Sequence, residues 1–313
     1  MRAYVLPDDE SGPALTEVPA PQLADDEVLV RVRASSVNPH DAMVANGSAA
    51  RYMTYHFPVV LGSDLCGTID ALGANVTDLA VGQRVFGLVR ERVAARGSFA
   101  QLVAVPREWV VPAPDNLDDV SAGALGLAAL TALRCVEAVR PAEGEAVLVN
   151  GATGGVGGYA VQMLADRGVH VIATARPGEE DELVRKLGAT HVVDWSDGDL
   201  ADAVRALRPD GVAAVVDLVN RDKDTLTALA TRLMGPGGRV ACTGHAADPE
   251  RLPGIHAVNV LAEIDQDALL AIADLAGAGR LRAPVTRVFG LEEIDRAFAA
   301  LSAGSLGKLA IRV

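Results

Sequence analysis

Residues 147–158 read Val-Leu-Val-Asn-Gly-Ala-Thr-Gly-Gly-Val-Gly-Gly. Four residues with strand character, 147–150, run directly into a cluster of glycines. An apolar helical pattern follows over residues 156–165, and a second strand-like run occupies residues 169–174. The stretch therefore predicts one complete strand–helix–strand unit of about 30 residues.

The glycines of this unit have separate physical roles. Gly154 and Gly155 have no side chains, so a pyrophosphate can approach their backbone, and Gly157 lets the helix pack against the strand. The helix N-terminus offers unpaired N–H groups and the positive end of its dipole to phosphates. Such a pattern alone also occurs in ordinary loops, but within a strand–helix–strand unit it predicts a dinucleotide site, although Ala152 replaces the usual first glycine. The candidate cofactor-binding residues of the loop are Ala152, Thr153, Gly154, Gly155 and Val156.

Composition narrows the class of protein. The chain has 313 residues, half of them hydrophobic, which is enough for two domains. Its net charge of −13 argues against a nucleic-acid partner, which needs a basic face. No apolar run has the length of a membrane span and no signal-peptide region begins the chain, so we expect a cytoplasmic protein without a membrane partner. The Ala-, Gly-, Val- and Arg-rich composition favours a bacterial source.

The chain changes character once along its length. Strand-like runs at residues 28–34, 67–73, 78–87 and 98–105, separated by turns, predict a compact β-rich domain. A helix over residues 121–139 begins an alternation of helices and strands that predicts a parallel sheet with helices on both faces. The last strand, 308–313, is expected to return to the first domain. The predicted domains are residues 1–119 with 282–313, and residues 120–281.

At this point the chain resembles the zinc-free quinone oxidoreductases of the medium-chain dehydrogenase/reductase superfamily. The similar segments are SVNPHD at residues 36–41, FPVVLGSD at 57–64, VGQRV at 81–85, GSFA at 97–100 and the glycine loop, in the same order. The resemblance implies an α/β protein with a GroES-like β-rich catalytic domain and a Rossmann domain, a doubly wound parallel sheet. Members of this family are commonly homodimers or homotetramers, and we expect a homodimer.

The zinc ligands of the superfamily are missing from their positions. Asn38 stands where zinc-dependent relatives have their first catalytic Cys, and Ser63 replaces their His ligand. A tetrahedral zinc site needs three or four N, S or O ligands in register. The three cysteines are far apart in sequence and form no C-x-x-C pair. We therefore expect no metal.

The residues after the second strand of the dinucleotide unit predict the nicotinamide. Ala175 occupies the position of the acidic residue that usually binds the ribose of NAD, so a 2′-phosphate meets no repulsion there. Thr174 and Arg176 are candidates to bind that phosphate, which favours NADP(H). The alternative for Arg176 is a solvated surface charge. Further candidate cofactor contacts are Thr131, Asn220 and Gly244.

Four residues are candidates for the chemistry. The resemblance places Asn38 beside the nicotinamide, where an amide can donate to a developing enolate or alkoxide; a turn-forming Asn is the alternative. His40 can donate a proton near neutral pH. Tyr52 and Tyr55 lie in a loop that carries a substrate-facing Tyr in related enzymes, and each can equally be a loop anchor. Few Arg or Lys residues lie in the expected site, which disfavours a bulky anionic substrate such as an acyl-CoA.

These observations predict an NADPH-dependent, zinc-independent reductase that transfers a hydride to a quinone or an α,β-unsaturated carbonyl substrate. Two alternatives remain open. One is a dedicated enone or ketone tailoring reductase of a secondary-metabolite pathway. The other is a nicotinamide-binding sensor with little catalysis.

Overall fold

The computed structural model describes residues 1–313, which form two compact units. Unit 1 comprises residues 1–130 and 263–313, and unit 2 comprises residues 131–262. The boundaries predicted from sequence would assign residues 120–130 and 263–281 to the second domain instead. Helix α8 (Gln266–Gly277) belongs to unit 1 because it packs against β10 (Val110–Pro112). Asn116 also donates hydrogen bonds to the carbonyls of Ala276 and Gly277 at the end of α8.

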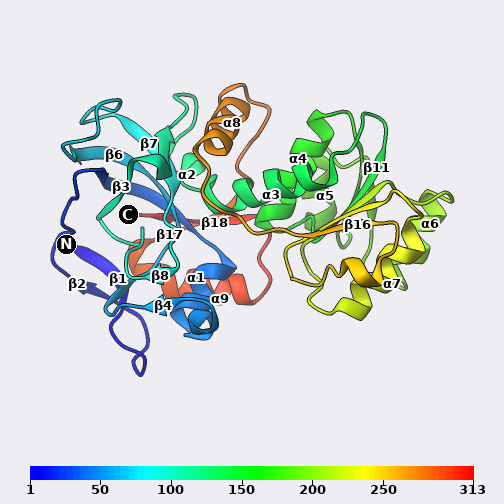
Figure 1. The fold of residues 1–313 in the computed structure, drawn as a ribbon, viewed down its shortest axis with the longest axis horizontal. Coiled ribbons are helices and arrows are strands. Elements are labelled where there is room, and N and C mark those ends of the chain that lie inside the picture. The colour runs from blue at the N-terminus through cyan, green and yellow to red at the C-terminus, as the bar shows by residue number, and fades with distance from the viewer. The chain divides into compact units, whose positions relative to one another are not determined.

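Unit 1 is built on a seven-stranded sheet around the long strand β3 (Glu27–Val37). Strand β3 pairs antiparallel with β6 (Asp64–Leu72), β9 (Leu102–Pro106) and the C-terminal strand β18 (Lys308–Arg312). The tail therefore returns to the first sheet, as the sequence predicted (Figure 1).

Shorter elements complete unit 1. The remaining strands are β1 (Arg2–Leu6), β2 (Ala14–Glu17), β4 (Thr54–Tyr55), β5 (Val59–Val60), β7 (Arg84–Leu88), β8 (Val93–Ala94) and β17 (Val285–Gly290). Its other helices are α1 (Pro39–Ala45), α2 (Asp119–Ala122) and α9 (Ile294–Ser302), with short 3-10 turns at Ser48–Arg51, Arg107–Trp109 and Leu291–Glu293. Side chains that are far apart in sequence, including Tyr4 of β1, Phe99 before β9 and Ile311 of β18, share one core.

The single helix predicted over residues 121–139 is wrong at its start. Helix α2 ends at Ala122 and α3 (Gly126–Val139) begins after a break. At the break the backbone lies against the buried carboxylate of Asp64, whose Oδ1 accepts a hydrogen bond from Leu127 N at 2.6 Å. A Cβ atom on Gly126 would lie 2.4 Å from the same oxygen, so only glycine fits there.

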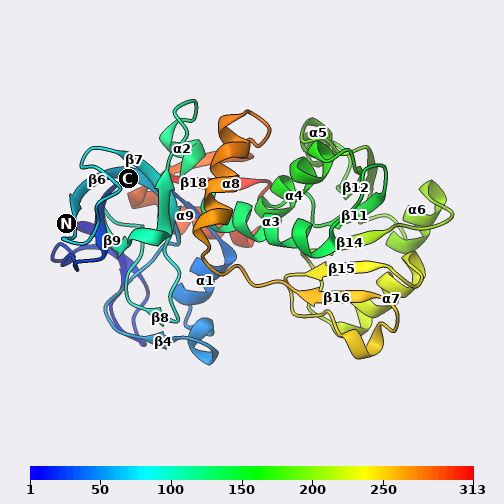
Figure 2. The ribbon, with the colours of Figure 1, turned by 45° about the horizontal axis from the view of Figure 1, so that its top comes forward.

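Unit 2 contains a six-stranded parallel sheet in the order β13-β12-β11-β14-β15-β16, which confirms the doubly wound fold. Figure 2 shows β14, β15 and β16 side by side, with β16 at the edge. The strands are β11 (Ala146–Asn150), β12 (His170–Thr174), β13 (His191–Val193), β14 (Ala214–Asp217), β15 (Arg239–Cys242) and β16 (His256–Asn259). The helices are α4 (Gly155–Asp166), α5 (Glu179–Lys186), α6 (Leu200–Leu207) and α7 (Lys223–Leu233), with a 3-10 turn at Pro249–Arg251.

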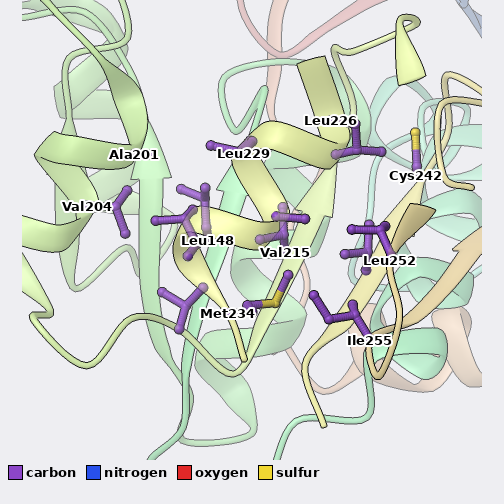
Figure 3. Packing of buried hydrophobic residues seen from close by; sticks show 14 of the residues in the cluster. Leu148, Ala201, Val204, Val215, Leu226, Leu229, Met234, Cys242, Leu252 and Ile255 are labelled. Carbon is purple, nitrogen blue, oxygen red and sulfur yellow. The ribbon is translucent and has the colours of Figure 1, made fainter. Parts of the chain in front are cut away.

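The sheet of unit 2 is buried on both faces. On one face, Leu148 and Val215 of the strands pack against Leu226 of α7 and Val204 of α6 (Figure 3). Helix α4 packs against β11 and β12. The strand order reverses between β11 and β14, which is where open α/β sheets bind ligands. None of the helices combines the length and the apolar character that crossing a bilayer requires.

Candidate functional site

The glycine loop connects β11 to the N-terminus of α4 at the reversal point of the sheet. Gly154 is the N-cap of α4, with φ −79° and ψ 175°. A Cβ atom on Gly157 would lie 2.2 Å from the carbonyl oxygen of Gly151, so the first turn of α4 touches the end of the strand. Ala152 is fully buried, whereas Thr153, Gly154, Gly155 and Val156 are partly exposed. The loop therefore presents backbone N–H groups, the donor set that a pyrophosphate needs.

A buried carboxylate fixes the neighbouring loop. Asp217 ends β14 and accepts hydrogen bonds from Asn150 Nδ2 at 2.9 Å and from the Nδ2 and backbone N of Asn220, each at 2.7 Å. Asn220, predicted as a cofactor contact, is thus held beside the glycine loop. Sequence reasoning missed Asp217 and Asn150, although a polar residue at the end of each of two buried strands was a usable signal.

Gly244 and Thr131, the other two candidate cofactor contacts, lie outside the glycine loop. Gly244 follows β15, and its backbone N donates to Cys242 Sγ at 3.3 Å. Thr131 lies on α3, partly exposed, at the first residue of unit 2.

The structure does not bring Thr174 and Arg176 together as one phosphate site. The Thr174 hydroxyl is buried and accepts a hydrogen bond from Gly151 N at 2.9 Å. Arg176 is exposed, and its guanidinium pairs with Glu180 at 2.5 Å and lies 5.5 Å from the ring centroid of Trp195. Thr174 thus braces the loop, while Arg176 is displayed at the end of β12.

Glu180 is a second residue that sequence reasoning missed. Its carboxylate also accepts a hydrogen bond from Arg176 N at 2.7 Å. Burial alone would raise the pKa of Glu180, but the hydrogen bonds from Arg176 and its charge hold the pKa below its usual value. A carboxylate therefore stands at the end of β12 even though Ala175 replaces the usual acidic residue. The run of acidic residues at 179–182, shortly after Arg176, was the available signal.

A buried polar network occupies the centre of unit 1. Asp64 Oδ2 accepts hydrogen bonds from Ser36, from Asn38 Nδ2 at 2.9 Å and from Lys308 Nζ at 3.2 Å. Lys308 Nζ also donates to Asn38 Oδ1 at 2.7 Å. All four side chains are buried. Both ends of the Asn38 amide are therefore engaged within the protein.

This network does not fit a zinc ion. Asn38 and Ser63 stand at the positions of two expected ligands, and the ammonium group of Lys308 lies against Asn38 and Asp64. Zinc prefers thiolate, imidazole and carboxylate donors. In residues 1–313 no group of three His, Cys, Asp or Glu side chains is placed to hold a metal ion.

Helix α1 carries two titratable groups beside a small cavity. Asp41, in its first turn, accepts hydrogen bonds from Asn38 N at 2.7 Å and Ser63 Oγ at 2.5 Å, so Asn38, and not Asp41, is the N-cap. Burial raises the pKa of Asp41 to about 7, and the charge of Asp64 adds to this rise. The hydrogen bond from Ser63 acts in the opposite direction but is the smaller effect.

His40 lies in the same turn and faces the cavity. Burial and the charge of Arg90 lower the pKa of His40 to about 4, so its ring is neutral at neutral pH. Its Nδ1 atom is buried and has no hydrogen-bond partner. The cavity has a volume of about 30 Å³, and its lining includes His40, Asp41, Ser63, Arg90 and several aliphatic side chains.

The two candidate tyrosines lie in the loop between α1 and β5. Tyr52 is half exposed, and its hydroxyl contacts Met43 Sδ at 3.8 Å. The Tyr55 hydroxyl donates to the Val44 carbonyl at 3.0 Å, and burial followed by the neighbouring Tyr52 raises its pKa. Neither tyrosine lines the cavity beside His40.

Comparisons with known proteins agree with this architecture. Residues 24–115 match the family model "Alcohol dehydrogenase GroES-like domain", and residues 155–263 match "Zinc-binding dehydrogenase". The chain belongs to the medium-chain dehydrogenase/reductase superfamily, a superfamily of oxidoreductases, in its quinone oxidoreductase-like group.

Curated relatives carry oxidoreductase names. The chain is 32% identical to a quinone oxidoreductase of Rattus norvegicus over 72% of this chain and 66% of the rat protein. It is 33% identical to the trans-enoyl reductase tazE of Aspergillus terreus over 67% of this chain and 74% of that protein. The chain thus spans slightly less than two thirds of the rat protein's length.

Solved structures share the whole fold. The quinone oxidoreductase from Coxiella burnetii has a TM-score of 0.89 at 25% identity, covering 100% of this chain and 99% of that one. A mycobacterial protein solved in complex with NADPH has a TM-score of 0.86 at 26% identity, covering 100% of both chains.

Proposed function

We propose that the protein is an NADPH-dependent, zinc-independent reductase that transfers a hydride to a quinone or an α,β-unsaturated carbonyl compound. The observation that carries the proposal is the glycine loop at the reversal point of the parallel sheet, in a chain of the quinone oxidoreductase-like group. The rat and Coxiella relatives are named quinone oxidoreductases, which supports the substrate class.

Each unit has its own task in this proposal. The bound nicotinamide supplies the hydride. In unit 2, the amides of Gly155 and Val156 bind the pyrophosphate, and Asp217 holds Asn220 in place. In unit 1, Asn38 acts as a positioning residue, because its amide joins Asp64 to Lys308 and its backbone begins the helix that carries His40.

Proton delivery follows from the ionisation states. His40 is neutral at neutral pH, so it can donate a hydrogen bond but does not carry the extra proton of an imidazolium that a proton donor would give up. Tyr52 is half exposed, so we propose that water, or Tyr52 in exchange with water, protonates the reduced product.

The preference for NADPH rests on Arg176. Its exposed guanidinium is held in place by Glu180 and Trp195 at the end of β12, and the similar mycobacterial structure contains NADPH. Arg176→Gln is expected to raise the KM for NADPH about tenfold or more without changing that for NADH, because one charge-assisted hydrogen bond is lost. Arg185→Gln is the matched control, since Arg185 also pairs with a carboxylate on α5, Asp181.

The test of the activity is cofactor oxidation with a panel of acceptors. NADPH and NADH are each supplied with 1,4-benzoquinone, 9,10-phenanthrenequinone, an enone and a simple ketone. Consumption of NADPH that depends on a quinone or an enone supports the proposal. Tight cofactor binding without turnover of any acceptor would favour the alternative of a nicotinamide-binding sensor with little catalysis.

A dedicated enone reductase of a biosynthetic pathway is the second candidate. The observation that favours it is the similarity to the trans-enoyl reductase of Aspergillus terreus. Turnover of enones together with inertness towards both quinones would favour this candidate over the first.

We also propose that the protein is a homodimer through the edge strand β16. This strand pairs only with β15, and Leu261 beyond it is 57% exposed. His256 N and Val260 N donate hydrogen bonds towards β15. Because backbone N–H groups alternate in direction along a strand, Ala257 N points away from the sheet.

The variant Ala257→Pro removes that outward donor and is expected to give a folded monomer by light scattering. A monomeric wild type would contradict the proposal. The predicted cytoplasmic location stays a prediction.

A further inference from the structure

Arg90 is a cation of unit 1 that has no counter-ion. It follows β7 and lines the same small cavity as His40. No hydrogen-bond acceptor or carboxylate pairs with its guanidinium, whereas Arg96, also at the cavity, is bound by Glu27 and Glu91. Burial lowers the pKa of Arg90, and Tyr52, Asp41 and Glu263 oppose this shift only from beyond hydrogen-bond and ion-pair distance. A half-buried guanidinium without a counter-ion would be stabilised by a bound anion.

His40 presents a second unsatisfied group to the same space. Its Nδ1 atom is buried without a partner, and Arg90 is the charged group that acts on its ring. A buried polar atom without a hydrogen bond costs about 1–3 kcal/mol, so a ligand that satisfies it gains affinity. The imidazole can donate from Nδ1 while it stays neutral.

The rest of the lining determines what kind of anion fits. Val44, Met53 and Val89 contribute apolar side chains, and the volume of about 30 Å³ leaves room for a small group only. The carboxyl groups of Asp41 and Glu91 also line the cavity, but each is already bound, Asp41 by Ser63 and Asn38 and Glu91 by Arg96. A planar carboxylate matches the fork of a single guanidinium, whereas a phosphate normally takes more donors than this cavity offers. An acyl-CoA is too bulky for it.

We propose that this cavity binds the carboxylate group of a small unsaturated acid, with its oxygens on the Arg90 guanidinium and His40 Nδ1 and its carbon chain extending out of the cavity. The inference rests on the proposed function because it takes the bound acid to be a substrate of the reductase. It then narrows the substrate class to α,β-unsaturated carbonyl compounds that also carry a carboxylate.

Equilibrium binding tests the site without turnover. Crotonate and crotonamide have the same shape and differ in charge, and each is titrated into the full chain by NMR. We expect the wild type to bind crotonate about ten- to a hundredfold more tightly than crotonamide. Arg90→Gln should abolish this difference and Arg90→Lys should restore part of it. Arg92→Gln is the control, because Arg92 is exposed and two residues away, and it should leave the difference intact.

Two results would overturn the site. One is equal affinity of the wild type for crotonate and crotonamide, and the other is an equal loss in the Arg90→Gln and Arg92→Gln variants. Turnover separates this failure from that of the proposed function. NADPH oxidation by the wild type with neutral 3-penten-2-one tests the reductase alone, whereas trans-4-oxo-2-pentenoate should show a KM raised at least tenfold by Arg90→Gln. Crotonate selectivity without reduction of either ketone would leave the site standing and refute the reductase.

Discussion

Replacing Lys308 by Met should strongly destabilise unit 1. Lys308 is 3% exposed, and its Nζ atom lies 3.2 Å from Asp64 Oδ2 and 2.7 Å from Asn38 Oδ1. Methionine fills a similar volume but leaves the Asp64 carboxylate buried without a counter-ion and the Asn38 oxygen without this donor. Breaking a buried ion pair in this way costs about 3–5 kcal/mol.

The magnitude is set by what Asp64 retains. Hydrogen bonds from Ser36, Asn38 Nδ2 and Leu127 N remain, which favours the lower end of that range. At about 2–4 °C per kcal/mol for a unit of this size, the melting temperature of unit 1 should fall by about 6–20 °C. Calorimetry suits the measurement because two units can melt in separate transitions.

Two comparisons make this reasoning refutable. Lys186→Met removes an exposed pair with Glu182, at 3.6 Å, and should change stability by less than about 0.5 kcal/mol. Combining Lys308→Met with Asp64→Asn removes both charges and should recover part of the loss. A loss below about 1 kcal/mol in Lys308→Met, or a double variant worse than the single one, would show that the pair is not what stabilises this core.

Three further predictions concern pH, the glycine loop and the cofactor. Because the folded pKa of Asp41 is raised to about 7 from 3.8, the folded state binds more protons than the unfolded state between these values, and stability should fall as pH rises from about 4 to 7. Asp41→Asn should flatten this slope in melting curves recorded against pH. Gly157→Ala should abolish cofactor binding and destabilise unit 2, because its Cβ would lie 2.2 Å from a carbonyl oxygen. Gly154→Ala, whose Cβ meets nothing closer than 3.6 Å, should stay as stable as the wild type and only weaken binding in calorimetric titration. Glu180→Gln should lower the KM for NADPH severalfold relative to NADH, and an unchanged ratio would mean that this carboxylate does not face the ribose.

The sequence predicted the part of the fold that is encoded locally. Residues 147–174 carry strand, glycine turn, helix and strand in one continuous run, so each element is visible without knowledge of its partners. The parallel sheet and its helices are confirmed for the same reason. Strands β1 and β17 were not predicted, and part of the pairing of β1 is not local: Val5 lies opposite Val60.

The break before α3 shows the same limit. It exists because the backbone at Gly126 and Leu127 meets the carboxylate of Asp64, which is distant in sequence. A continuous apolar pattern cannot report such a contact.

The residues of the candidate site also fall into two groups, those that a local motif reveals and those that only long-range contacts bring together. The loop residues follow from a motif, but the contact between Asn38 and Lys308 joins positions 270 residues apart. The cavity shared by His40 and Arg90 also has no sequence signature, since the two residues come from different elements. The pairing of Arg176 with Glu180 is the exception, because only four residues separate them along the chain.

The pairing of β18 with β3 has a consequence for biosynthesis. Unit 1 cannot close its sheet until residues 308–312 have been synthesised, after all of unit 2. During translation, β3 therefore keeps an open edge and Asp64 lacks Lys308, while every strand of the unit 2 sheet has already been synthesised. An exposed strand edge beside a buried charge is prone to aggregation. A ribosome that stalls before codon 308 would therefore release a chain whose first unit exposes this edge and needs chaperones to keep it from aggregating.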